Sequence, residues 1–162
     1  MYASIVSHNI RASWRQLNEH NCVPVLGQLA PKFRYVFLGQ HALSGERHTT
    51  ATLERFFQRI FRVFPDVRFE VSEVLVKGMP WNTTAVALVN ATASLANGET
   101  YRNEISQTIR LRWGKIIEIR TLEDTQKLVA ALAKQLEAGV TEAGVTEAGA
   151  APIQDVEPTE RF

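Results

Sequence analysis

The sequence contains a single cysteine, Cys22, among its 162 residues. One cysteine cannot form an intrachain disulfide, and no cysteine cluster or pair of histidines at helical spacing indicates a metal site. Basic residues show no excess either, because 18 lysines and arginines stand against 17 acidic residues. This balance argues against binding to a phosphate backbone. We therefore expect no metal, no cofactor and no nucleic-acid partner.

Long apolar runs are also missing. No stretch approaches the roughly 20 apolar residues that cross a bilayer, and the N-terminal residues lack the pattern of a signal peptide. We expect a cytoplasmic protein without a membrane partner. What is present is ordinary globular composition, with 45% hydrophobic and 22% charged residues, which suits a single domain with one core.

The periodicity of apolar residues changes along the chain. Loosely helical spacing predicts two helices over residues 2–20 and 22–29, and strict alternation predicts a strand over residues 31–39. Thr49 or Thr50 is expected to cap a longer helix that Pro65 ends, with phenylalanines along its apolar face. Such a stripe is typical of core packing, and it can also form the wall of an apolar pocket.

From Asp66 the period becomes two, which predicts four strands in series. Short connections make neighbouring strands antiparallel, and a closing helix is expected over residues 125–139. Residues 1–135 then form the domain. Residues 136–162 carry an EAGVT repeat, and we expect them to be a weakly ordered tail.

The dipeptide Asn97-Gly98 predicts a hairpin with a two-residue turn, in which Leu95 pairs with Thr100. This register places several polar and apolar side chains on one inner face of the sheet, namely Leu88, Asn90, Asn103, Ile105 and Gln107. An alanine-rich row from Ala85 to Ala93 then forms the outer face. The inner amides either satisfy one another or line a ligand cavity, and a one-residue error in the turn would exchange the faces.

Short motifs follow one another in a recognisable order. They are GQHALSGER (39–47), FQRIFRVFPDVRFEV (57–71), KGMPWNT (77–83), GETYRNE (98–104), LRWGKIIEI (111–119) and LEDTQKL (122–128). Together they resemble the SnoaL-like group of the nuclear-transport-factor-2-like superfamily over most of residues 5–135. The resemblance implies an α+β fold in which N-terminal helices pack on a strongly curved, mostly antiparallel sheet, forming a cone with an internal pocket. It also implies a homodimer through the outer sheet face.

Candidate site residues come partly from this resemblance. Asp124 matches the acidic residue that cyclase relatives use as acid or base at the end of the last strand, and it is also a favoured helix N-cap. His41 is an acid/base partner or a loop histidine bonded to backbone. Glu123, the residue before Asp124, is expected to face solvent or pair with an arginine. The expected ligand contacts are Trp14, Tyr35, Phe57, Leu88, Asn90, Asn103, Ile105 and Gln107.

Two functions remain open from the sequence. The first is a pocket that binds a small, largely apolar molecule, with cofactor-free acid/base catalysis of the isomerase, cyclase or hydrolase type. The second is a non-catalytic dimeric module for ligand binding or protein interaction. The absence of an evident partner for Asp124 favours the second, and the aromatic lining favours a ligand of some kind.

Overall fold

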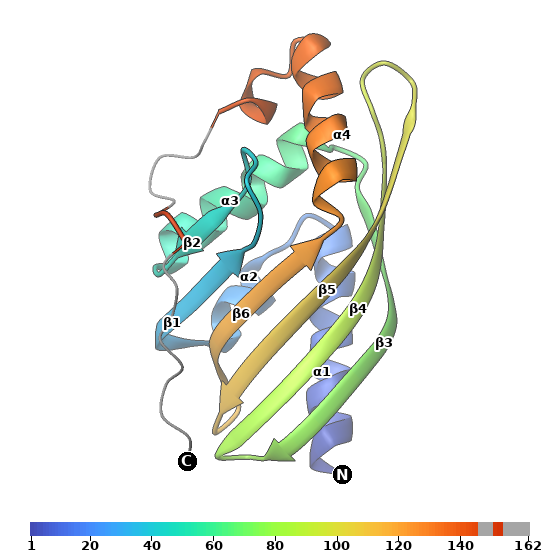
Figure 1. Cartoon of the computed structure of the whole chain (residues 1–162). Helices are drawn as coiled ribbons and strands as arrows, with labels where there is room; N and C mark the ends of the chain where they lie inside the picture. Colours follow the sequence, from blue (N-terminus) through green and yellow to red (C-terminus); the bar gives the residue numbers. More distant parts are fainter. Residues whose placement is uncertain (146–150, 154–162) are drawn as a thin grey trace.

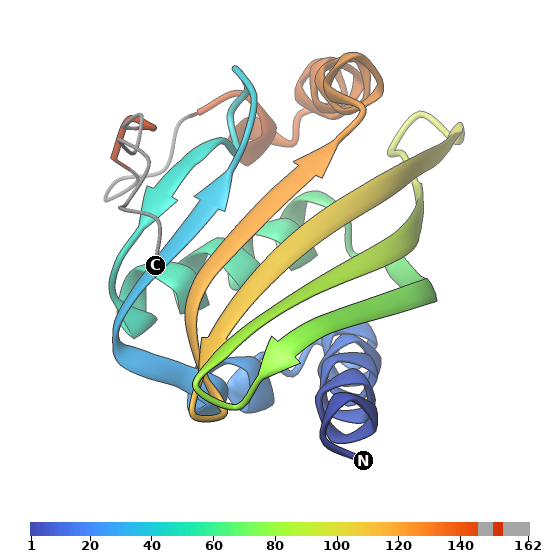
Figure 2. The ribbon, with the colours of Figure 1, turned by 60° about the horizontal axis from the view of Figure 1, so that its bottom comes forward.

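The computed structural model describes residues 1–145 and 151–153 of the chain. Helices pack on one face of a six-stranded sheet that curls without closing, which confirms the predicted α+β fold (Figure 1). The curvature is clearest in Figure 2, where the strands bend around helix α3 (Thr50–Val63). None of the described helices is long and apolar enough to cross a bilayer.

The helices form where the apolar periodicity predicts them. Near the N-terminus, helix α1 spans Tyr2–Asn18 and helix α2 spans Val23–Gln28. After the last strand come helix α4 (Thr125–Glu137) and a short 3-10 helix, η1 (Thr141–Ala143). Thr49 caps α3 as predicted, because its hydroxyl accepts a hydrogen bond from the Thr52 amide at 3.2 Å.

The sheet has the order β2-β1-β6-β5-β4-β3. Its strands are β1 (Leu29–Phe37), β2 (Gly45–Arg47), β3 (Arg68–Met79), β4 (Asn82–Ser94), β5 (Thr100–Arg112) and β6 (Lys115–Glu123). The last four form the predicted antiparallel meander. Strand β1 pairs with β6 in parallel, and β2 forms inside the segment that the sequence indicates as a turn-rich connection.

The β4–β5 hairpin corrects the predicted register. Its loop has three residues rather than two, because the Leu95 amide bonds to the Glu99 carbonyl and Gly98 adopts a positive φ of 88°. Ser94 therefore pairs with Thr100, and the whole of β4 shifts by one residue against β5.

This shift exchanges the two faces of β4 and leaves those of β5 as predicted. Ala85, Ala87, Ala91 and Ala93 are buried, so the expectation that the alanine row forms the outer face is wrong. Small side chains on this face leave room for the helices that cover the sheet.

The β5–β6 hairpin closes with a two-residue loop, Trp113-Gly114, between the paired residues Arg112 and Lys115. Both loop residues have a positive φ, 52° for Trp113 and 75° for Gly114, as a type I′ turn requires. Asparagine, aspartate and glycine favour the first position of such a turn. A tryptophan there costs about 1 kcal/mol of backbone strain.

The C-terminal segment folds back onto α3. Buried Arg59 donates hydrogen bonds to the carbonyls of Ala42, Glu142 and Val145, and Arg62 pairs with the Glu142 carboxylate. Ala151 forms an isolated antiparallel bridge with Glu46 of β2. The prediction of a weakly ordered tail falls partly on residues 146–150 and 154–162, which lie outside the described residues.

Candidate functional site

A cavity of about 90 Å³ lies between the sheet and helices α1, α2 and α3. Its wall is almost entirely apolar, and the aromatic side chains of Trp14, Tyr35 and Phe57 contribute to it, as do Ile105 and Gln107. These five residues lie where the sequence predicts them. A cavity that holds benzene in another protein measures about 150 Å³, so a ligand of ring size would require these side chains to move.

Two residues expected in this wall lie elsewhere. Leu88 and Asn90 are on the outer face of β4, with Leu88 37% exposed, so the prediction that they face the inner cavity is wrong. The physical reason is the extra residue in the β4–β5 loop, since a one-residue shift moves every side chain of a strand to the other face. Both line a separate hollow on the outer face of the sheet.

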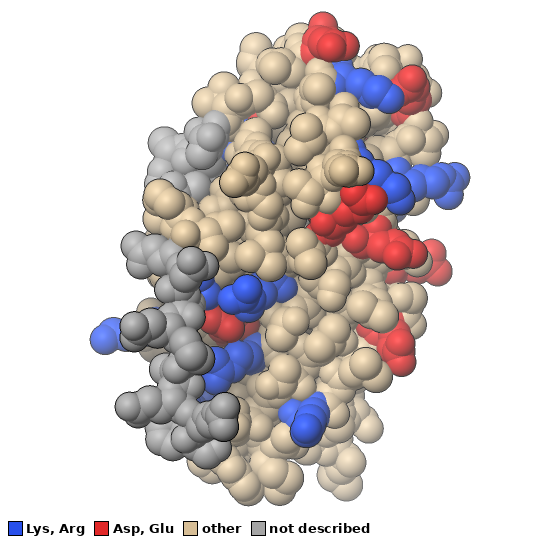
Figure 3. All heavy atoms as spheres, in the orientation of Figure 1, with Lys and Arg blue, Asp and Glu red and all other residues tan. Residues whose placement is uncertain are grey.

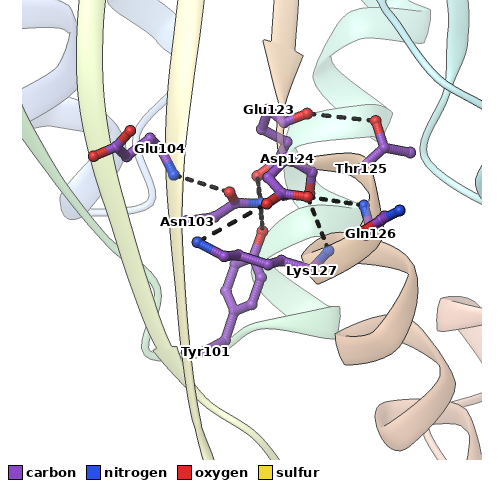
Figure 4. A network of polar contacts seen from close by, with 8 residues as sticks. All are labelled: Tyr101, Asn103, Glu104, Glu123, Asp124, Thr125, Gln126 and Lys127. Carbon is purple, nitrogen blue, oxygen red and sulfur yellow. Dashed lines mark hydrogen bonds and ion pairs between the residues drawn. The ribbon is translucent and has the colours of Figure 1, made fainter.

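The main polar group of the cavity is the Glu123 carboxylate (Figure 4). Glu123 ends β6 opposite Ile105, and this register directs its side chain inward. Its Oε2 accepts hydrogen bonds from the Tyr101 hydroxyl at 2.7 Å and from the Asn103 amide at 2.9 Å. The expectation that Glu123 faces solvent or pairs with an arginine is therefore wrong.

Asn103 holds this arrangement together rather than facing the cavity. Its Nδ2 also donates to the Tyr101 hydroxyl and to the Asp124 carbonyl, and its Oδ1 accepts from the Glu104 amide. The side chain is 4% exposed, and both its amide nitrogen and its carbonyl oxygen have hydrogen-bond partners. Its role in the described structure is to position Tyr101 and Glu123.

Burial controls the protonation of this pair. It raises the pKa of Glu123 to about 7, although the hydrogen bonds from Tyr101 and Asn103 act in the opposite direction. Burial, together with the Glu123 charge, also raises the pKa of the Tyr101 hydroxyl. Tyr101 therefore stays a neutral donor, whereas Glu123 can exchange a proton near neutral pH.

A second polar group lies on the same wall. The Gln107 amide donates to the Thr121 hydroxyl at 3.1 Å, and Thr121 contacts the Tyr35 hydroxyl at 3.4 Å. All three residues are buried, and burial raises the pKa of Tyr35 to about 12. Thr121 thus links Gln107 to Tyr35, while Gln107 also lines the inner cavity.

Asp124 occupies the N-cap of α4. Its Oδ1 accepts hydrogen bonds from the amides of Gln126 at 3.1 Å and Lys127 at 3.3 Å, and the side chain is exposed. Of the two interpretations of Asp124, this geometry is that of the helix cap. Of the two neighbouring acidic residues, Glu123 lines the inner cavity and Asp124 does not; Asp124 lines the hollow on the outer face of the sheet.

His41 is held by backbone groups of its own loop. Its Nε2 contacts the Leu38 carbonyl at 3.1 Å, and the Leu43 amide donates to its Nδ1 at 3.3 Å. Burial lowers the pKa of His41, which keeps the ring neutral. The ring packs edge-on against Phe37, which itself lines the cavity, but His41 does not.

One signal in the sequence could have found Glu123. Ile119, Thr121 and Glu123 share one parity along the last strand, so a strand that buries Ile119 also directs Glu123 inward. Among the described residues, no group of three or more histidine, cysteine or acidic side chains could hold a metal ion.

Comparison with known proteins decides the family. The profile of the SnoaL-like domain matches residues 10–119, more than half of the chain. The protein belongs to the SnoaL-like family. No curated protein matches the sequence.

Solved structures with the same fold share little sequence with this SnoaL-like chain. IdmH from Streptomyces antibioticus, described as a candidate polyketide cyclase, is 17% identical with a TM-score of 0.64, covering 78% of this chain and 97% of its own. AclR from Streptomyces galilaeus, described as a candidate hydroxylase, is 15% identical with a TM-score of 0.61, covering 82% and 96%. A protein of unknown function from Burkholderia pseudomallei, described as NTF2-like, is 18% identical with a TM-score of 0.64, covering 77% and 95%. At these identities the likeness establishes the fold alone.

Replacing Asp124 separates its cap from any chemical role. Asp124→Ala in this SnoaL-like protein should lower the free energy of unfolding by about 1 kcal/mol, because two amides of the first turn lose their acceptor. Asp124→Asn should keep most of that stability, since asparagine caps equally well. Chemical denaturation of both variants measures the difference, and equal losses in the two would contradict the capping role.

Glu123 should make stability depend on pH. Below its unfolded pKa, near 4.5, the carboxyl is protonated in both states and folding carries no penalty. As the pH rises toward the folded pKa of about 7, the unfolded state ionises first, so stability falls and then levels off. Because Glu123 is only half-buried, we expect a loss on the order of 1–2 kcal/mol.

The matched variant for this prediction is Glu123→Gln, which keeps the shape of the side chain and removes its titration. The difference in unfolding free energy between the two proteins, measured from pH 4 to pH 8, cancels contributions from other groups such as His41. A difference that does not change with pH would show that Glu123 has an ordinary pKa in the folded protein.

Proposed function

We propose that this SnoaL-like protein binds a small, largely apolar molecule with one carbonyl group in the inner cavity, and that Glu123 transfers a proton there. The observation that carries the proposal is the position of the Glu123 carboxylate. It lies on an apolar wall with a pKa of about 7, as a general acid or base working at neutral pH requires.

The hydrogen bonds divide the two oxygens of this carboxylate. Tyr101 and Asn103 both donate to Oε2, and among the described residues no hydrogen bond is made to Oε1. Oε2 is thus anchored, and Oε1 is the atom we assign to accept a proton from a carbon next to the carbonyl. This assignment moves the catalytic role from Asp124 and His41 to Glu123.

A second candidate is a binding module without catalysis. It is favoured by the Tyr101 hydroxyl, which already donates to Glu123 and therefore does not face a developing oxyanion. In that case the polar groups orient a bound molecule and no bond changes. The neighbouring solved structures described as a cyclase and a hydroxylase fit the first candidate better, at the level of family likeness.

The two candidates differ in what Glu123 does to a bound ketone. We expect the protein to accelerate exchange of the α-hydrogens of small cyclic ketones with deuterated water, followed by NMR. Glu123→Gln should reduce this rate about a hundredfold or more, because a positioned base contributes that much. Asp124→Asn is the matched control, a carboxylate-to-amide change at the next residue, and should leave the rate unchanged.

Native mass spectrometry on the same variants tests binding separately. Retained ketone adducts without exchange would support the binding module and remove the catalytic proposal. If the unmodified protein shows neither ketone adducts nor hydrogen exchange, both candidates are contradicted.

We also propose a homodimer through the outer sheet face. The alanine row no longer supports it, but exposed Leu75, Leu88 and Leu122 lie on this face among charges of both signs, including Glu104 and Arg102. Such a surface can pair with a second copy of itself.

Leu88→Arg should convert the dimer to a monomer in light scattering, because it brings like charges together near the centre of the contact. Val129→Arg on exposed α4 should leave the mass unchanged. A monomeric unmodified protein would contradict the dimer.

A further inference from the structure

Two exposed tryptophans lie together at one end of the sheet. Trp81 and Trp113 are 52% and 70% exposed, with their ring centroids 6.0 Å apart, and Met79 beside them is also exposed. They belong to the β3–β4 and β5–β6 turns, which lie at the same lower end of the molecule in Figure 1 and Figure 2. We call Met79, Trp81 and Trp113 the tryptophan tip. Scattered exposed apolar residues are normal, whereas paired exposed tryptophans point to a partner.

The turn at Trp113 does not need a tryptophan. This residue occupies the first position of a type I′ turn, where asparagine or glycine would relieve the positive φ. Its side chain packs mainly on Trp81 and is otherwise open to solvent. A residue that strains the local backbone without filling the core is one whose side chain is used elsewhere.

The tip is held rigidly. The Trp113 amide donates to the Pro80 carbonyl, which joins the two turns. The Thr83 hydroxyl bonds to the Met79 carbonyl at 2.7 Å and to the Tyr2 hydroxyl at 2.8 Å, which ties the β3–β4 turn to α1. Little backbone freedom in the two turns is then left to be lost on binding.

The charges around the tip have one sign. Lys77, Arg112 and Lys115 lie within two residues of the tip's aromatic and methionine side chains along the chain. Residues 74–85 and 108–117, which flank the two turns, contain no aspartate or glutamate. On the face drawn in Figure 3, a basic side chain is visible toward the lower end, in the part that the grey atoms leave uncovered.

We propose that the tryptophan tip binds the surface of an anionic lipid bilayer, with both indoles in the headgroup region. Tryptophan prefers this interface because its ring is apolar and its N–H is polar, and nearby lysines and arginines are attracted to anionic headgroups. A second copy of the same tip fits poorly, since it would bring like charges together. This proposal departs from the expectation of no membrane partner, and it needs no spanning segment because the contact is confined to the surface.

Vesicle binding by the full chain tests the proposal. The protein should co-sediment with phosphatidylcholine vesicles that contain phosphatidylserine, and its tryptophan emission should shift to the blue. Three cations near the surface should strengthen this binding on the order of a hundredfold over pure phosphatidylcholine, and added salt should weaken it.

Trp113→Asn is the sharpest variant, because asparagine suits the type I′ turn and should keep or raise the melting temperature. It should nevertheless weaken vesicle binding at least tenfold, as should Trp81→Ser. Val129→Ser, which alters an exposed apolar residue on α4 at the other end, is the control and should bind as the unmodified protein does.

Three results would overturn the proposal. These are no binding to anionic vesicles, binding that both tryptophan variants retain, and self-association that depends on the tip while vesicles remain unbound. The last result would assign the tip to a second copy of the chain. None of these measurements involves Glu123, so they stand apart from the proposed chemistry.

Discussion

The pairing of β5 with β4 on one side and with β6 on the other is the constraint on which the site depends. The three-residue loop closed by Gly98 sets Ser94 opposite Thr100, and the alternation of side chains then determines both faces of the sheet. The same alternation continues into β6, where Ile105 lies opposite Glu123. The direction of the Glu123 carboxylate in the cavity wall thus follows from the backbone pairing of β5 with β6 rather than from any local preference of that residue.

Two neighbouring carboxylates end β6 and have different environments. An ionised carboxylate in an apolar wall is unfavourable, and the donors on Tyr101 and Asn103 offset only part of the cost, which is why the pKa of Glu123 rises. Asp124, one residue further, leaves the strand direction and places its side chain at the start of α4. Its backbone carbonyl still accepts a hydrogen bond from Asn103, so the capping residue Asp124 and the Glu123 carboxylate share one amide donor.

Signals within a few residues of sequence predict the helices and strands well, whereas the pairing between strands depends on contacts that such signals do not encode. The Thr49 cap and the phenylalanine spacing of α3 lie within a few residues of each other, so the sequence carries them directly. Asn97-Gly98 suits loops of two or three residues, and only tertiary packing chooses between them. The two-residue loop that the sequence favours puts Leu88 and Asn90 on the inner face, whereas the observed three-residue loop puts them on the outer face. The parallel pairing of β1 with β6 joins strands far apart in the chain and has no local signature. The parity of Glu123 with Ile119 is enough to predict that its side chain points inward. The family resemblance instead assigns the acid/base role to Asp124.

Contacts cover the outer strand β2 and the first part of the outer strand β3. At β3, the Asn18 side chain donates to the Phe69 carbonyl and accepts from its amide, as a neighbouring strand would, and Arg11 donates to the Val71 carbonyl. At β2, Ala151 exchanges both backbone hydrogen bonds with Glu46. Unpaired strand edges are templates for joining other chains into fibrils. Helix α1 and the C-terminal segment therefore also act as guards against aggregation, and a chain shortened before Ala151 would present β2 as an open edge.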